Sequence, residues 1–181
     1  DIEAAANGLI AGNFGASGQS CVAGSRAFVQ RGIYDDLLAR IEDKASKIVV
    51  GDPLDGATHV GPLCTVAQVQ NIETVLEKSK SQGATIRFGG TRSKGLEGNY
   101  FDPTLVECAG QNTETLNVEM FGPVMSIVPF DDEQEAIDLA NDSDFGLGSG
   151  VFTQNLARAH RVSDRIRSGI CWINTYRAVS P

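Results

Sequence analysis

The stretch RAFVQRGIYDDLLARIEDKASKI, residues 26–48, combines two kinds of hydrophobic pattern. Its first five residues, Arg26 to Gln30, predict a strand. Apolar side chains then recur at helical spacing from Ile33 to Ile48, before Gly51-Asp52-Pro53 ends the pattern. A strand that passes directly into an amphipathic helix is the unit from which α/β folds are built.

The same alternation continues to the end of the chain. Further strands are predicted at 84–88, 100–106, 125–130, 150–153 and 169–175, and helices at 1–10, 66–76, 133–141 and 156–166. The glycine-rich stretches at 12–18 and 146–150 are predicted to be a loop and a turn. Strands joined by helices need crossover connections, which are typical of parallel sheets. We therefore expect one α/β domain over residues 1–181, with a mostly parallel open sheet and helices on both faces.

Composition excludes several classes of function. The 181 residues carry 15 Lys and Arg against 23 Asp and Glu, a net charge of -8 that opposes binding to nucleic acid or to an anionic membrane surface. No apolar run has the length of a membrane helix, and we expect a cytoplasmic protein. The four cysteines are widely spaced and only two histidines accompany them, so we expect reduced thiols and no metal site. The first residues, Asp1-Ile2-Glu3, suggest a processed or truncated N-terminus.

The stretch Gly18-Gln19-Ser20-Cys21-Val22-Ala23-Gly24-Ser25-Arg26 contains the most informative cysteine. A thiol is a nucleophile only as thiolate, and nearby backbone N–H groups or cations favour that form. Glycines around Cys21 could expose such N–H groups. Composition alone leaves a second interpretation open, in which Cys21 is a buried structural thiol.

The same stretch resembles the active-site segment of the aldehyde dehydrogenase superfamily. The resemblance spans the chain, because similar segments follow in the family's order at 119–124, 144–147, 151–153 and 169–174. It implies the fold of that family's catalytic, cysteine-bearing domain. The chain departs from the family at Phe14-Gly15-Ala16, where Phe-Phe-Asn is frequent, and at Val118, where a second acid is frequent.

The resemblance assigns roles to five residues. Cys21 would be the nucleophile that attacks an aldehyde, Glu119 would accept hydrogen bonds from the nicotinamide ribose, and Phe121 would be its apolar neighbour. Trp172 and Asn174 would line the aldehyde pocket. The cofactor would be NAD or NADP, the partner a small-molecule aldehyde, and the full-length protein a homo-oligomer. The general-base glutamate, an oxyanion-hole asparagine and the dinucleotide-binding domain would lie upstream of Asp1, and a closing tail beyond Ser180-Pro181. We therefore expect these 181 residues alone to be inactive.

Several alternatives remain open at this point. Within the family, the acyl group could pass to coenzyme A instead of water. Outside it, the chain could be a non-catalytic interaction module, or a cysteine hydrolase that uses His59 or His160. Glu119 could be an ordinary surface acid before Gly122-Pro123, and Asn174 could cap a turn.

Overall fold

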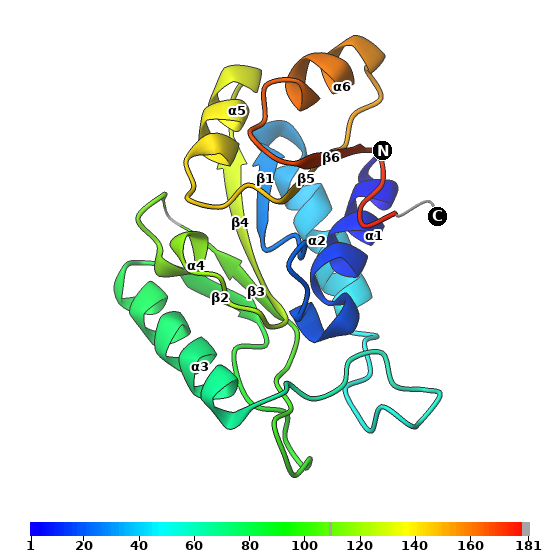
Figure 1. Cartoon of the computed structure of the whole chain (residues 1–181), viewed down its shortest axis with the longest axis vertical. Helices are drawn as coiled ribbons and strands as arrows, with labels where there is room; N and C mark the ends of the chain where they lie inside the picture. Colours follow the sequence, from blue (N-terminus) through cyan, green and yellow to red (C-terminus); the bar gives the residue numbers. More distant parts are fainter. Residues whose placement is uncertain (109, 179–181) are drawn as a thin grey trace.

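The computed structural model describes residues 1–108 and 110–178 and contains both expected kinds of element (Figure 1). The helices are α1 (Ile2–Asn13), α2 (Tyr34–Ala45), α3 (Val66–Ser81), α4 (Glu114–Asn117), α5 (Glu133–Asn141) and α6 (Leu156–Ser163). The strands are β1 (Arg26–Gln30), β2 (Thr85–Phe88), β3 (Thr104–Glu107), β4 (Val124–Phe130), β5 (Gly148–Val151) and β6 (Ile170–Ile173). Short 3₁₀ turns occupy η1 (Gly15–Gly18) and η2 (Arg31–Ile33).

The strands form two sheets. The larger has the order β1-β4-β3-β2, in which β4 pairs parallel with both β1 and β3 while β2 is antiparallel to β3. The smaller consists of β5 and β6, which pair parallel. The expectation of an α/β fold with a mostly parallel sheet is confirmed, although the described strands form two separate sheets instead of one.

Helices cover both faces of the larger sheet, as the alternation of its buried side chains requires. On one face, Met125 and Ile127 of β4 belong to a core that includes residues of α1 and α2, among them Ile41. On the other, Val124 and Val128 of the same strand pack with residues of α3 and α4. Figure 1 shows these two helix pairs on opposite sides of the sheet.

Side-chain caps fix where four of the helices begin. At each start a short polar side chain accepts a hydrogen bond from a backbone N–H that has no partner within the helix. These bonds run from Ala4 N to Asp1 Oδ1, from Gln68 N to Thr65 Oγ1, from Glu135 N to Asp132 Oδ1 and from Arg158 N to Asn155 Oδ1, at 2.9–3.1 Å. The part of the chain that the structure describes contains no helix with both the length and the apolar character needed to cross a membrane.

Some predicted boundaries were wrong, and tertiary contacts explain two of them. Helix α1 continues through Gly12 to Asn13, which is fully buried and donates from Nδ2 to the Val124 carbonyl at 3.1 Å. Gly148 to Gly150 belong to β5 instead of a turn. Methyl groups added at Gly148 and Gly150 would lie 3.3 Å from Trp172 and 2.6 Å from Tyr176, so the glycines admit these rings.

Two further boundaries differ. Helix α2 ends at Ala45, well before Gly51, and residues 49–50 and 59–60 instead meet in a short bridge. The short helix α4 has no counterpart in the sequence prediction. Ser180 and Pro181, beyond which the resemblance places a closing tail, lie outside the described residues.

Candidate active site

Cys21 lies in an exposed tight turn immediately before β1. The turn closes through a hydrogen bond from Ala23 N to the Ser20 carbonyl at 2.9 Å, which places Cys21 at its first central position. The backbone N–H of Cys21 donates to no acceptor within residues 1–108 and 110–178. The turn therefore presents a thiol and an unused backbone donor together, the pair that attack on a carbonyl requires.

The chain enters this turn through an uncommon backbone conformation. Ala16, Ser17 and Gly18 have φ values of 54°, 56° and 70°, and two of them are not glycine. Left-handed non-glycine residues cost about 1–2 kcal/mol each, so neighbouring contacts must hold them. One contact is a hydrogen bond from Ser17 Oγ to the Gly61 carbonyl at 3.0 Å.

The Gln19 side chain provides the second contact. Its Oε1 accepts from the backbone N–H of Cys64 at 2.9 Å, and its Nε2 donates to the Pro62 carbonyl at 3.3 Å. Together with Ser17, Gln19 ties the approach to Cys21 to the loop at residues 61–64. The sequence stretch contained Gln19, but nothing local in it indicated this distant partner.

The chain leaves the turn through contacts with the protein core. Gly24 N donates to the Gly12 carbonyl of α1 at 3.1 Å, and Ser126 N in β4 donates to the Ser25 carbonyl at 2.8 Å. Strand β1 begins at the next residue. Both ends of the Cys21 turn are therefore held by the elements that form the larger sheet and its covering helix.

Glu119 and Phe121 lie in the segment that enters β4, the direct neighbour of β1. Both side chains are exposed, and Phe121 has a left-handed φ of 46°. Because β1 and β4 are parallel, the segments that precede them meet at the amino ends of these strands. A methyl group added at Gly18 would lie 2.0 Å from the Gly122 carbonyl oxygen, so the two segments touch through bare backbone.

Gln68 holds the Glu119 segment and was missed by the sequence analysis. Its Nε2 donates to the carbonyls of Met120 and Phe121 at 2.6 and 2.8 Å. The local signal, a glutamine three residues after the helix cap Thr65, is typical of a capping box, in which this side chain would return to its own helix. The structure directs it to the neighbouring segment instead.

Trp172 and Asn174 come from the smaller sheet. Gly148 connects Trp172 with the Cys21 turn, because a methyl group there would lie 3.3 Å from the indole and 3.4 Å from Val22. The amide of Asn174 pairs with the backbone of Thr153, accepting from its N–H at 2.8 Å and donating to its carbonyl at 2.9 Å. This pairing is the contact expected of a residue that fixes a turn, and pocket lining by Asn174 stays a prediction.

All four cysteines are free thiols. Cys108 is buried, and burial raises the pKa of its thiol, whereas Cys21 and Cys64 are exposed. His59 accepts a hydrogen bond at Nδ1 from Val49 N, which leaves that nitrogen occupied. Among residues 1–108 and 110–178, no three His, Cys, Asp or Glu side chains are arranged to hold a metal ion.

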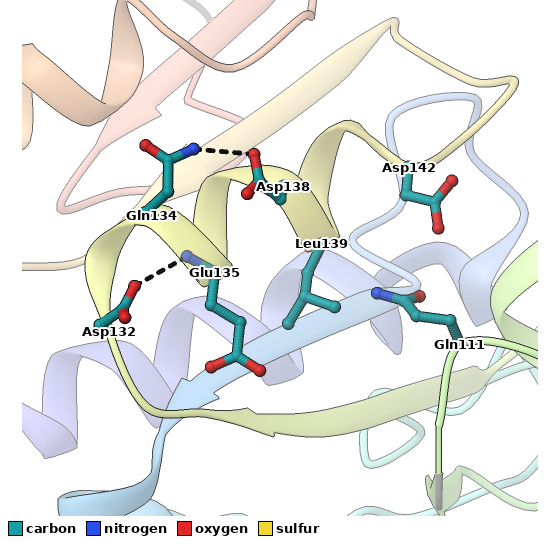
Figure 2. A pocket seen from close by; sticks show the side chains of 7 residues that line it. All are labelled: Gln111, Asp132, Gln134, Glu135, Asp138, Leu139 and Asp142. Carbon is teal, nitrogen blue, oxygen red and sulfur yellow. Dashed lines mark hydrogen bonds between the residues drawn. The ribbon is translucent and has the colours of Figure 1, made fainter.

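A shallow hollow of about 530 Å³ lies beside α5 (Figure 2). It contains none of the predicted site residues Cys21, Glu119, Phe121, Trp172 and Asn174. Several of its side chains make hydrogen bonds within α5 or at its start: Asp132 caps the helix, and Gln134 Nε2 donates to Asp138 at 2.8 Å. The residues that line it are Gln111, Asp132, Gln134, Glu135, Asp138, Leu139 and Asp142. The hollow is therefore separate from the candidate active site.

Comparisons with known proteins show which family the chain resembles along its whole length. A (Z)-2-((N-methylformamido)methylene)-5-hydroxybutyrolactone dehydrogenase of Acinetobacter baylyi is 47% identical over 100% of this chain and 37% of its own length. A betaine aldehyde dehydrogenase of Rhizobium leguminosarum is 44% identical over 97% of this chain and 37% of its own length. The chain thus spans little more than a third of these relatives.

Solved structures show the same similarity. A betaine aldehyde dehydrogenase from Staphylococcus aureus in complex with NAD+ superposes with a TM-score of 0.96 at 35% identity, covering 99% of this chain and 36% of the other. An NAD-dependent aldehyde dehydrogenase from Sinorhizobium meliloti gives 0.97 at 36% identity, covering 100% and 36%. The model of the aldehyde dehydrogenase family matches residues 1–181. The chain therefore belongs to the aldehyde dehydrogenase family.

Proposed function

We propose that this chain is the nucleophile-bearing part of an NAD(P)-dependent aldehyde dehydrogenase that oxidises an aldehyde to a carboxylic acid. The observation that carries the proposal is the exposed turn in which the Cys21 thiol lies beside its own undonated backbone N–H. The family relatives support the reaction class. We also propose that the full-length protein is a homo-oligomer.

Cys21 supplies the covalent step. Its thiolate forms a C–S bond with the aldehyde carbon, and the carbonyl oxygen takes up the electron pair as an oxyanion. The Cys21 N–H is one donor that stabilises this oxyanion. Glu119 and Phe121 would hold NAD(P), which would supply the hydride acceptor that oxidation of the Cys21 adduct to a thioester needs. The resemblance assigns the second oxyanion donor, and the base that activates water for thioester hydrolysis, to parts of the longer relatives that this chain does not span.

Glu119 and Phe121 fit the cofactor. The Glu119 carboxylate is exposed and has no hydrogen-bond or ion-pair partner in the described part of the chain, so its oxygens are available to two vicinal ribose hydroxyls. The Phe121 side chain is 38% exposed and offers an apolar surface beside it. The two hydrogen bonds from Gln68 fix the backbone between them.

The aldehyde would approach from the side of the smaller sheet. Trp172 and Val22 both pack against Gly148, and Val22 is the residue next to the nucleophile. We propose that Trp172 borders the aldehyde pocket. For Asn174 we propose a weaker contribution to substrate binding, since the oxygen and the nitrogen of its amide are both hydrogen bonded to the backbone of Thr153.

The test uses the full-length protein with NAD or NADP and a panel of aldehydes. In the variant Cys21→Ser we expect NADH or NADPH formation to fall to background, because a hydroxyl without a base is a poor nucleophile. The matched control is Cys64→Ser, which removes the other exposed thiol and should keep turnover. Product analysis with and without coenzyme A distinguishes a free acid from an acyl thioester. Wild-type rates in Cys21→Ser, or no turnover of any aldehyde by the wild type, would contradict the proposal.

A further inference from the structure

The segment that follows β6 packs against both sides of the Cys21 turn. Methyl groups added at Gly12 and Gly24 would lie 2.7 and 3.4 Å from the ring of Tyr176. These two glycines are themselves hydrogen bonded to each other where the chain leaves the turn. The residue after Tyr176 is therefore placed beside the nucleophile loop by a packed aromatic ring.

That residue is Arg177, and its backbone has a left-handed φ of 59°. Non-glycine residues in this region are uncommon and concentrate at functional sites. The guanidinium Nη1 donates to the Gly15 carbonyl at 3.2 Å, in the turn that leads to Cys21. A methyl group added at Gly15 would lie 3.2 Å from the same nitrogen, so the glycine permits this close approach.

Arg177 has no carboxylate partner within residues 1–108 and 110–178. Other arginines of the chain do: Arg31 pairs with Asp131 at 2.6 Å and Arg92 with Glu73 at 2.7 Å. Arg26, Arg165 and Arg167 also lack a carboxylate partner in the described part of the chain. Arg26 donates to two backbone carbonyls and Arg165 to the Gln134 side chain. Arg177 is only partly exposed and uses one of its five N–H donors on Gly15, in a chain whose net charge is -8. An unpaired cation at this place has capacity for an anionic ligand.

We propose that Arg177 binds a carboxylate carried by the aldehyde substrate, at the end remote from the carbonyl that Cys21 attacks. This inference rests on the proposed function and adds a substrate class to it, namely aldehydes that bear an acid group. A planar guanidinium binds a carboxylate through two parallel hydrogen bonds, which a neutral aldehyde cannot provide. Gly15 anchors one edge of the guanidinium and leaves the remaining donors to the substrate.

The experiment compares two aldehydes in the full-length protein, succinic semialdehyde and its methyl ester. The ester keeps the reacting group and the chain but removes the negative charge. In the wild type we expect kcat/KM to be higher for the acid. In Arg177→Gln we expect the ratio of acid to ester to fall roughly 10–100-fold, the range for one hydrogen-bonded charged group, mainly through a higher KM for the acid. Arg177→Lys should give an intermediate ratio, because an ammonium binds as a point charge.

The matched control is Arg92→Gln, which removes one positive charge far along the chain and should leave the ratio unchanged. Because each ratio is taken within one variant, turnover of the ester also reports that the variant is folded. Glutaric semialdehyde and its ester repeat the comparison with a longer spacer. Equal ratios in wild type and Arg177→Gln for both pairs, or a wild type that prefers the esters, would overturn the inference while leaving the proposed function intact. Turnover of none of these four by a protein that oxidises another aldehyde would overturn the inference alone, whereas no turnover of any aldehyde would overturn both.

Discussion

The two sheets of this molecule differ in how deeply they are buried. In the larger sheet, Leu105, Val106 and Ile127 are completely buried between helices. In the smaller sheet no residue of β5 or β6 is fully buried, and Ile170 is 48% exposed. Parallel sheets normally have both faces covered, and the smaller sheet is less completely covered than that.

The residues proposed for the reaction and those proposed for substrate binding lie on different sheets. The segments that carry Cys21 and Glu119 run directly into β1 and β4, which are neighbouring strands of the well-packed sheet. The residues assigned to the aldehyde, Trp172 and Arg177, lie in and after β6. The proposed nucleophile and cofactor contact are thus attached to the best-packed part, whereas the groups proposed to select the substrate lie on the less buried part.

The largest effect should come from the larger sheet. Ile127→Ala removes three buried carbons and leaves a cavity between β4 and the helices, so we expect the free energy of unfolding to fall by about 2–5 kcal/mol. Ile170→Ala is the matched change in the smaller sheet and should cost about 0.5 kcal/mol or less. Urea unfolding followed by circular dichroism measures both. Similar losses for the two variants would remove the distinction between the sheets.

A smaller effect is expected where the two segments touch. Gly18→Ala places a methyl group 2.0 Å from the Gly122 carbonyl at a left-handed residue. We expect a loss of about 1–3 kcal/mol in stability, together with slower reaction of Cys21, because the backbone must move. Gly32→Ala is the control, since nothing lies within 4 Å of its added methyl group. Thermal melts and alkylation of Cys21 give the readouts, and equal behaviour of both variants would show that the segments do not meet.

The smallest effect concerns thiol accessibility and leaves the fold unchanged. Cys108, which directly follows β3, is buried, and burial raises the pKa of its thiol, whereas Cys171 in β6 is partly exposed. The thiolate is the form that reacts, so a raised pKa reduces reaction at a given pH and delays it to higher pH. We expect iodoacetamide to label Cys171 before Cys108 from neutral pH upward, as followed by peptide mapping. Labelling of Cys108 before Cys171 would contradict the conclusion that the larger sheet is the better packed of the two.

Much of the fold was predictable because it depends on local patterns. Strand β1 and helix α5 have the predicted bounds, since a run of strand-forming residues and an N-cap aspartate act within a few positions. The end of α1 and the start of β5 were not predictable. Asn13 is held by a carbonyl in β4, and the glycines of β5 admit side chains from Trp172 and Tyr176, all distant in sequence.

The sequence by itself determined the alternation of strands and helices, the family resemblance and the identity of Cys21 as the candidate nucleophile. Only the tertiary structure decided what surrounds that thiol. Gly18 meets Gly122 because β1 and β4 pair in parallel, and Gln68 and Arg177 reach the site through contacts with segments far along the chain. The physical reason is the range of the interactions: periodicity and capping act between residues a few positions apart, whereas strand pairing and packing join residues whose separation no local pattern encodes.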